Sequence, residues 1–123
     1  MKTFRDLIVW QKAHKLVLEV YRLTKSFPRE ETYGLVSQIR RSAASAATNI
    51  VEGFKRTSGK ENLHFLNMSD GSLEETKYHL LLARDLGYIE ENEFKFVEEL
   101  SDEVGRLLCG YQKALKSKEY GRI

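Results

Sequence analysis

The chain contains very few residues that interrupt a helix. Its 123 residues include one proline, Pro28, and few of the turn dipeptides that separate short strands. A domain built from many short strands needs such turns, so the sequence favours a few long helices. A chain of this length buries enough surface for one hydrophobic core. We therefore expect a single domain over residues 1–123.

Four segments carry apolar residues at the three- and four-residue spacing of an amphipathic helix. Ser58 and Glu61 form a capping sequence before the third segment, and Gly87 marks its end. Gly53 is interpreted as the terminator of the second helix. The tail after the fourth helix is expected to be loose. The expected helices cover about residues 6–25, 33–54, 59–86 and 91–116. Joints this short predict an all-α, antiparallel up-down-up-down four-helix bundle.

The second helical segment is nearly free of large side chains in its middle. Residues 38–53 read QIRRSAASAATNIVEG, with six consecutive Ser and Ala residues after two arginines. Small residues on the inner face of a helix allow a neighbouring helix backbone to approach closely. Large residues from other helices then fill the space above them. We expect this segment to lie at a close helix–helix contact.

The first two helical segments have wider apolar arcs than one seam of a bundle requires. A bundle helix needs an apolar stripe of roughly 100°. The surplus predicts a second buried surface and therefore a homo-oligomer. The alternative is a few tolerated exposed apolar residues, which are common on protein surfaces. The residues expected at the subunit interface are Val9, Leu16, Leu23, Ala44 and Val51.

Composition places the chain among cytoplasmic globular proteins. No stretch approaches the roughly 20 apolar residues of a membrane helix, and the first residues do not resemble a signal peptide. The single cysteine, Cys109, excludes a disulfide framework and suits a reducing compartment. We interpret Cys109 as packed and inert. These features predict a cytoplasmic protein without a membrane partner.

Two pairs of residues have the spacing of metal ligands. Glu61 and His64 form an E-x-x-H pair, but di-iron bundles use two such pairs and further glutamates. Glu75 and His79 lie four residues apart, yet a lone histidine near a core is more often hydrogen-bonded than ligating. No glycine-rich nucleotide loop or nucleophile elbow is present in the sequence. We expect a non-enzyme with no metal, no cofactor and no catalytic residue.

The charges are divided unevenly along the chain. Residues 1–57 hold eleven Lys and Arg against five Asp and Glu, a net charge of +6, whereas residues 58–123 hold nine against thirteen, a net charge of −4. Such a division indicates either a basic face for an anionic partner or complementary surfaces between subunits. An ordinary solvated face is the alternative. The candidate phosphate-binding residues are Lys12, Lys15, Arg22, Arg40, Arg41, Lys55 and Arg56.

Several segments together resemble one protein family. They are DLIVWQKA near the N-terminus, FPREETYGLVSQIRRSA, NIVEG and GSLEE, and the likeness runs from residue 4 to about 115. The sequence resembles the four-helix-bundle proteins encoded in 23S rRNA intervening sequences, which are sometimes labelled ribosomal proteins. The resemblance implies an up-down bundle that forms a homopentamer. It also implies kinship with the accessory variability proteins of diversity-generating retroelements, which are basic pentamers that bind nucleic acid and a reverse transcriptase.

Two functions follow from the charges and the resemblance. The first is a nucleic-acid-binding oligomer that contacts the phosphates of rRNA or another structured RNA, or of DNA. The second is a protein–protein scaffold in which the pentamer presents a surface to a protein partner and binds no nucleic acid. The family has no established cofactor or catalytic residue to carry over. In the QIRR segment the matching basic residues are Arg40 and Arg41, which either contact RNA or brace the bundle.

Overall fold

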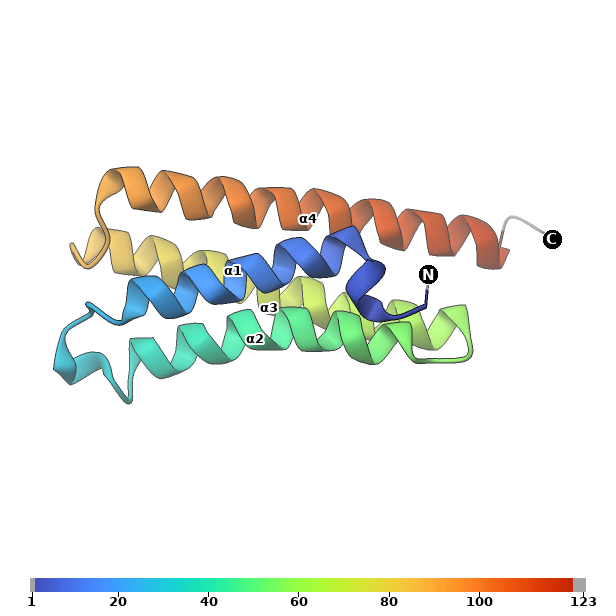
Figure 1. Cartoon of the computed structure of the whole chain (residues 1–123), viewed down its shortest axis with the longest axis horizontal. Helices are drawn as coiled ribbons and strands as arrows, with labels where there is room; N and C mark the ends of the chain where they lie inside the picture. Colours follow the sequence, from blue (N-terminus) through green and yellow to red (C-terminus); the bar gives the residue numbers. More distant parts are fainter. Residues whose placement is uncertain (1, 121–123) are drawn as a thin grey trace.

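Four α-helices lie side by side along one long axis (Figure 1). The structure, a computed structural model, describes residues 2–120. Short 3-10 turns precede the first two helices, and no strand occurs in the described range. This confirms the predicted all-α, four-helix architecture. The elements are η1 (Phe4–Asp6), α1 (Ile8–Thr24), η2 (Arg29–Glu31), α2 (Leu35–Phe54), α3 (Gly59–Asp85) and α4 (Glu91–Tyr120).

Each helix packs against two others. Helices α1 and α3 both contact α2 and α4 but do not contact each other, so they occupy opposite corners of the bundle. Figure 1 shows the chain running back and forth along the long axis. Cross-helix ion pairs agree with this arrangement, since Lys12 of α1 pairs with Glu103 of α4, whereas the later residue Arg22 pairs with the earlier residue Glu93. The residue numbers therefore rise along α1 while they fall along α4.

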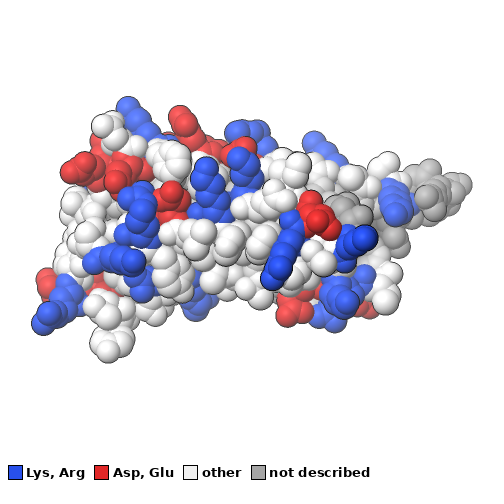
Figure 2. All heavy atoms as spheres, viewed as in Figure 1, with Lys and Arg blue, Asp and Glu red and all other residues white. Residues whose placement is uncertain are grey.

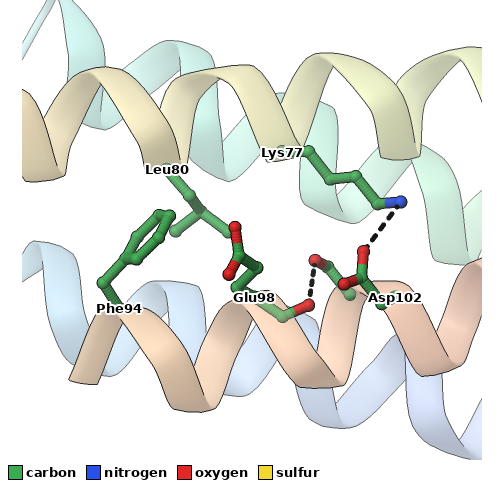
Figure 3. Close-up of a pocket in the computed structure, with 6 residues that line it drawn as sticks. Lys77, Leu80, Phe94, Glu98 and Asp102 are labelled. Atoms are coloured by element: carbon green, nitrogen blue, oxygen red, sulfur yellow. Dashed lines mark hydrogen bonds and ion pairs between the residues drawn. The ribbon is translucent and has the colours of Figure 1, made fainter. Parts of the chain in front are cut away.

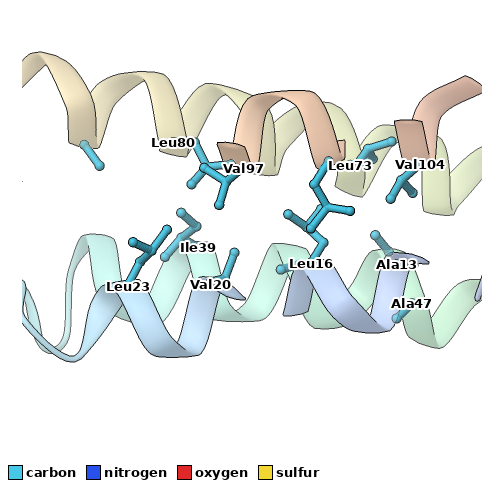
Figure 4. Packing of buried hydrophobic residues seen from close by; sticks show 14 of the residues in the cluster. Ala13, Leu16, Val20, Leu23, Ile39, Ala47, Leu73, Leu80, Val97 and Val104 are labelled. Carbon is cyan, nitrogen blue, oxygen red and sulfur yellow. The ribbon is translucent and has the colours of Figure 1, made fainter. Parts of the chain in front are cut away.

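The core lies along the axis between the four helices and is built by all of them. Buried aliphatic side chains meet there in successive layers (Figure 4). Burial of such side chains is the main favourable contribution to folding, at roughly 1.5–3 kcal/mol each. The residues labelled in Figure 4 are Ala13, Leu16, Val20 and Leu23 of α1, Ile39 and Ala47 of α2, Leu73 and Leu80 of α3, and Val97 and Val104 of α4.

Helix α3 begins and ends where the sequence predicts. The Ser58 side chain accepts a hydrogen bond from the backbone N–H of Glu61 at 3.1 Å, which confirms Ser58 as the predicted cap. Gly87 has a φ of 80°, a left-handed conformation that favours glycine. The N–H of Tyr88 donates to the carbonyl of Ala83, and the N–H of Gly87 donates to that of Arg84. These two bonds satisfy carbonyls at the helix end in a Schellman motif.

Two expectations about helix ends are wrong. Gly53 does not terminate α2, because it lies inside the helix and has no left-handed φ. It lies instead where α3 packs tightly against α2, and a Cβ there would stand 2.6 Å from the Asn62 side-chain oxygen. The tail is not loose as far as it is described, since α4 continues to Tyr120. Residues 121–123, the end of that predicted tail, lie outside the described residues.

Candidate nucleic-acid interface

The seven candidate phosphate-binding residues do not converge on one patch. Three lie on α1, two on α2 and two in the joint between α2 and α3: Lys12, Lys15 and Arg22, then Arg40 and Arg41, then Lys55 and Arg56. On the face shown in Figure 2, basic side chains are interleaved with acidic and uncharged ones. Acidic side chains gather at the end of the bundle where α4 begins. The basic surface is therefore spread along α1 and α2 rather than focused.

Four of the seven form ion pairs within the chain. The first two link α1 to α4: Lys12 lies 3.4 Å from Glu103, and Arg22 lies 2.7 Å from Glu19 and 3.5 Å from Glu93. Arg41 reaches from α2 to α3, where it lies 2.7 Å from Glu75. Arg56, just beyond the end of α2, lies 3.0 Å from Glu52 in the last turn of that helix. Exposed pairs of this kind contribute roughly 0–1 kcal/mol, so a phosphate can displace the carboxylate at little cost.

Lys15, Arg40 and Lys55 form no ion pair among the described residues. Arg40 is nevertheless held in place, because its Nε donates a hydrogen bond to the Thr24 hydroxyl at 2.9 Å. Its guanidinium also lies 4.6 Å from the centre of the Tyr21 ring, which places a cation over an aromatic face. Arg40 thus braces α1 against α2.

A buried polar cluster joins α2 to α3 beneath Arg41. The Thr76 hydroxyl donates to the Ser42 hydroxyl at 2.9 Å, and both residues are fully buried. His79 Nδ1 lies 3.4 Å from the same Ser42 oxygen, and His79 Nε2 lies 3.8 Å from the Glu75 carboxylate. Further along the seam, the Ser69 hydroxyl donates to the Ala46 carbonyl at 2.6 Å. These contacts make His79 a hydrogen-bonded histidine at the edge of the core, as its sequence position predicts.

The predicted interface residues fall into two groups. Val9, Leu16 and Leu23 are buried in the core of the single chain, so their side chains offer no surface to a second subunit. For these three the prediction is wrong, because they face the centre of the bundle rather than the surplus arc. Ala44 and Val51 are half-buried on α2 and keep some accessible surface.

Other apolar residues are exposed instead, on α1 and also on α3. Leu18 and Tyr21 lie on the outside of α1, and Tyr78 and Leu81 lie on the outside of α3. The predicted interface includes neither Leu18 nor Tyr21. It missed the α3 pair. Their one signal is their position in the helical repeat, because Tyr78 and Leu81 fall outside the stripe formed by the buried residues Leu73 and Leu80.

A comparison with protein-family models assigns the chain to a family. The model described as 23S rRNA-intervening sequence protein matches residues 5–110, from η1 to the middle of α4. The chain belongs to this family. The match contains all the candidate phosphate-binding residues and all the exposed apolar residues named above.

One solved structure shares this fold. It is the crystal structure of a protein with unknown function from the S23 ribosomal protein family of Bacteroides thetaiotaomicron. It superposes with a TM-score of 0.80 at 25% sequence identity and covers 86% of this chain and 99% of its own. No curated protein matches. The comparisons therefore place the 23S rRNA-intervening sequence fold on the chain without assigning a function to it.

Hollows on this member of the 23S rRNA-intervening sequence family are small or shallow. The hollow between α3 and α4 has about 50 Å³ of free space, room for a few water molecules (Figure 3). Lys77 and Asp102 form a 3.2 Å ion pair at its rim, and Ser101 donates to the Glu98 carbonyl. A larger, mainly apolar hollow of about 410 Å³ lies where Phe4 and Val51 meet.

The described residues add no evidence for a metal or nucleophilic site. No three His, Cys, Asp or Glu side chains within them are placed to share a metal ion. Cys109 is exposed rather than packed, so that interpretation is wrong. No helix in the described part of the chain is long and apolar enough to cross a membrane.

Acidification should lower the stability of the fold through His79. Burial lowers the pKa of His79, the nearby Glu75 opposes that shift, and Arg41 adds to it. A lowered pKa means that the unfolded chain binds the proton more tightly than the folded chain. The stabilisation is therefore present above the ordinary histidine pKa of about 6.5 and is lost as pH falls through the lower folded pKa. Urea unfolding of the wild type and of His79→Gln between pH 8 and pH 5 measures this effect.

Between pH 8 and pH 5, the unfolding free energy of His79→Gln should fall by less than that of the wild type. His64→Gln is the matched control, since His64 is exposed on the same helix. It should follow the wild-type pH profile. Parallel profiles for the wild type and His79→Gln would show that His79 does not contribute.

Proposed function

We propose that the chain is a non-enzymatic up-down-up-down bundle that assembles as a homopentamer and binds the phosphate backbone of structured RNA. The basic surface of α1 and α2 is the binding surface. The observation that carries the proposal is the excess of basic over acidic residues on α1 and α2. Helices α1 and α2 hold five Lys and Arg against two Asp and Glu, whereas α3 and α4 hold eight against twelve. Because α1 packs against α2, these basic residues lie on two adjacent helices. Carboxylates of α3 and α4 reach three of them, Lys12, Arg22 and Arg41.

The contacts of individual cations support this surface. Lys15, Arg40 and Lys55 have no carboxylate partner in the described part of the chain, and the other four are held by weak exposed pairs. Each copy thus offers only a modest number of phosphate contacts. Five copies in one particle act together on a single RNA, because linked sites raise the effective concentration at one another. Five surfaces that each make few phosphate contacts then together bind the RNA more tightly than one surface alone.

Binding to RNA should weaken steeply with salt and lose affinity when unpaired cations are reversed. We expect the double variant Lys15→Glu/Lys55→Glu to bind a structured RNA hairpin at least about tenfold more weakly than the wild type. The slope of log K against log salt should fall by about 2, at roughly 1 for each lost phosphate contact. Fluorescence anisotropy at several salt concentrations measures both quantities.

A charge-matched variant on the acidic half is the control. Lys95→Glu/Lys113→Glu makes the same change in net charge at two exposed positions of α4. It should reduce affinity much less, since it leaves α1 and α2 intact. Binding that does not change between 50 and 200 mM salt would overturn the proposal. Equal losses in the two double variants would show that net charge alone acts.

A protein–protein scaffold is the second candidate function. It is favoured by the engagement of Lys12, Arg22, Arg41 and Arg56 with carboxylates of their own chain. These pairs give the cations a structural role that needs no RNA. The same anisotropy experiment separates the two functions. A purified oligomer that is free of RNA and does not bind the hairpin at low salt supports the scaffold.

A further inference from the structure

The exposed face of α1 has an apolar centre with a basic border. Leu18 is 57% exposed and Tyr21 is 42% exposed, and they lie one helical turn apart. Lys15 and Arg22 lie one turn to either side of Leu18, and Lys25 lies one turn beyond Tyr21. Among the described residues, neither Lys15 nor Lys25 has a carboxylate partner, whereas Arg22 pairs with Glu19 and Glu93. We call Lys15, Leu18, Tyr21, Arg22 and Lys25 the α1 patch.

The exposed face of α3 has an apolar centre with an acidic border. Tyr78 is 59% exposed and Leu81 is 38% exposed, again one turn apart. Glu74 lies one turn before Tyr78, and Asp85 lies one turn after Leu81. Glu74 has no cationic partner within the described range, and Asp85 pairs only with its neighbour Arg84. These four residues form the α3 patch.

The two patches have opposite charge and cannot meet within one chain. Helices α1 and α3 do not contact each other and lie at opposite corners of the bundle (Figure 1). Both patches face outward, away from the core that the two helices share. Protein interfaces typically have an apolar, often aromatic centre and a polar rim. Opposite charges on the two rims favour the correct pairing and disfavour wrong ones.

We infer that copies of the chain associate head to tail, with the α1 patch of one copy against the α3 patch of the next. A symmetric contact between two α1 patches would bring the basic residues Lys15, Arg22 and Lys25 of one copy against those of the other. Two α3 patches would bring Glu74 and Asp85 together in the same way. The head-to-tail contact instead pairs each basic rim with an acidic one. Contacts of this type form a ring when the rotation between copies closes. The inference rests on the proposed self-association and names the surfaces that make it.

Two variants that each disable one patch test the pairing. Leu18→Asp places an acid in the α1 patch opposite an acidic partner, and Leu81→Lys places a base in the α3 patch opposite a basic partner. Light scattering during size-exclusion chromatography of RNA-free protein gives the number of subunits in each particle. The wild type should contain more than two subunits, and each variant alone should be a monomer. An equimolar mixture should recover particles of at least two subunits, because one intact α1 patch can still meet one intact α3 patch.

Three controls keep the result interpretable. Tyr33→Asp changes a residue that is 95% exposed in the α1–α2 joint, outside both patches, and should keep the wild-type mass. Circular dichroism checks that each variant is folded. If either variant is unfolded, the milder reversals Lys15→Glu and Glu74→Lys should reduce association singly and restore it when the two proteins are mixed.

Three results would overturn the inference. They are a monomeric wild type, wild-type mass for Leu81→Lys, and a mixture that stays monomeric. Wild-type mass for Leu81→Lys together with a monomeric Leu18→Asp would mean that α1 pairs with itself. RNA binding is measured separately by anisotropy, so failure of the RNA-binding proposal leaves the mass measurements unaffected.

Discussion

Replacing Gly53 with alanine should lower the free energy of unfolding by about 1–3 kcal/mol, although alanine is the better helix former. The added Cβ would lie 2.6 Å from the Asn62 Oδ1 atom, 3.1 Å from the Asn62 carbonyl oxygen and 3.1 Å from the Phe65 Cβ. Two of these three atoms cannot rotate away, because one is backbone and one is a Cβ. The α2 and α3 backbones must therefore separate. Urea unfolding gives the change as a shift of the midpoint.

Gly71→Ala is the matched control for Gly53→Ala. Gly71 is exposed on α3, and nothing lies within 4 Å of the position its Cβ would take. The substitution there should raise stability by about 0.5–1 kcal/mol through helix propensity alone. If both substitutions were stabilising, the close approach of α3 to Gly53 would not exist in solution.

Replacing Ala46 with leucine should lower the free energy of unfolding by about 1–3 kcal/mol or more, because it overpacks the seam between α2 and α3. Ala46 is only 2% exposed. The Ser69 hydroxyl lies 2.6 Å from the Ala46 carbonyl, so α3 passes directly over this turn of α2. Three additional carbon atoms require the helices to move apart, which also stretches that hydrogen bond. Ala43→Leu, at another buried position of α2, should be destabilising by a similar amount.

The same substitution at an exposed site separates overpacking from the intrinsic effect of leucine. Ala114 is exposed on α4, so Ala114→Leu should change stability by less than about 0.5 kcal/mol. Thermal unfolding of all three leucine variants compares them directly. An unchanged melting temperature for Ala46→Leu would show that the seam has free space at this turn.

The helices could be predicted from the sequence because their signals are local. Ser58 caps α3 within one turn, and Gly87 ends it with a left-handed φ. Gly53 looks the same in the sequence but has a different role. It allows α3 to approach, and its contact Asn62 belongs to the next helix. A local pattern identifies a glycine but does not say whether a turn or a neighbour requires it.

The candidate site was less predictable because its contacts are distant in sequence. The pairing of Arg56 with Glu52 four residues earlier follows from helical spacing. The pairing of Arg41 with Glu75 spans 34 residues and depends on how α2 lies against α3. The spacing of apolar residues likewise showed that the apolar arc of α1 is wider than one seam of a bundle requires. It did not separate Leu16, which faces the core, from Leu18, which faces outward.

The hydrogen bonds between α2 and α3 have a consequence for how the two helices can slide. The side chains of serine and alanine are short, so they interdigitate little with a facing helix. A contact built from them permits several alignments of similar energy. Sliding α2 by one turn along α3 would break the Ser42–Thr76 bond and the Ser69–Ala46 bond at once. Each such bond contributes about 0.5–1.5 kcal/mol. Both hydrogen bonds form in only one alignment of the two helices. The hydroxyls therefore select that alignment among those that the small side chains of the seam would otherwise allow.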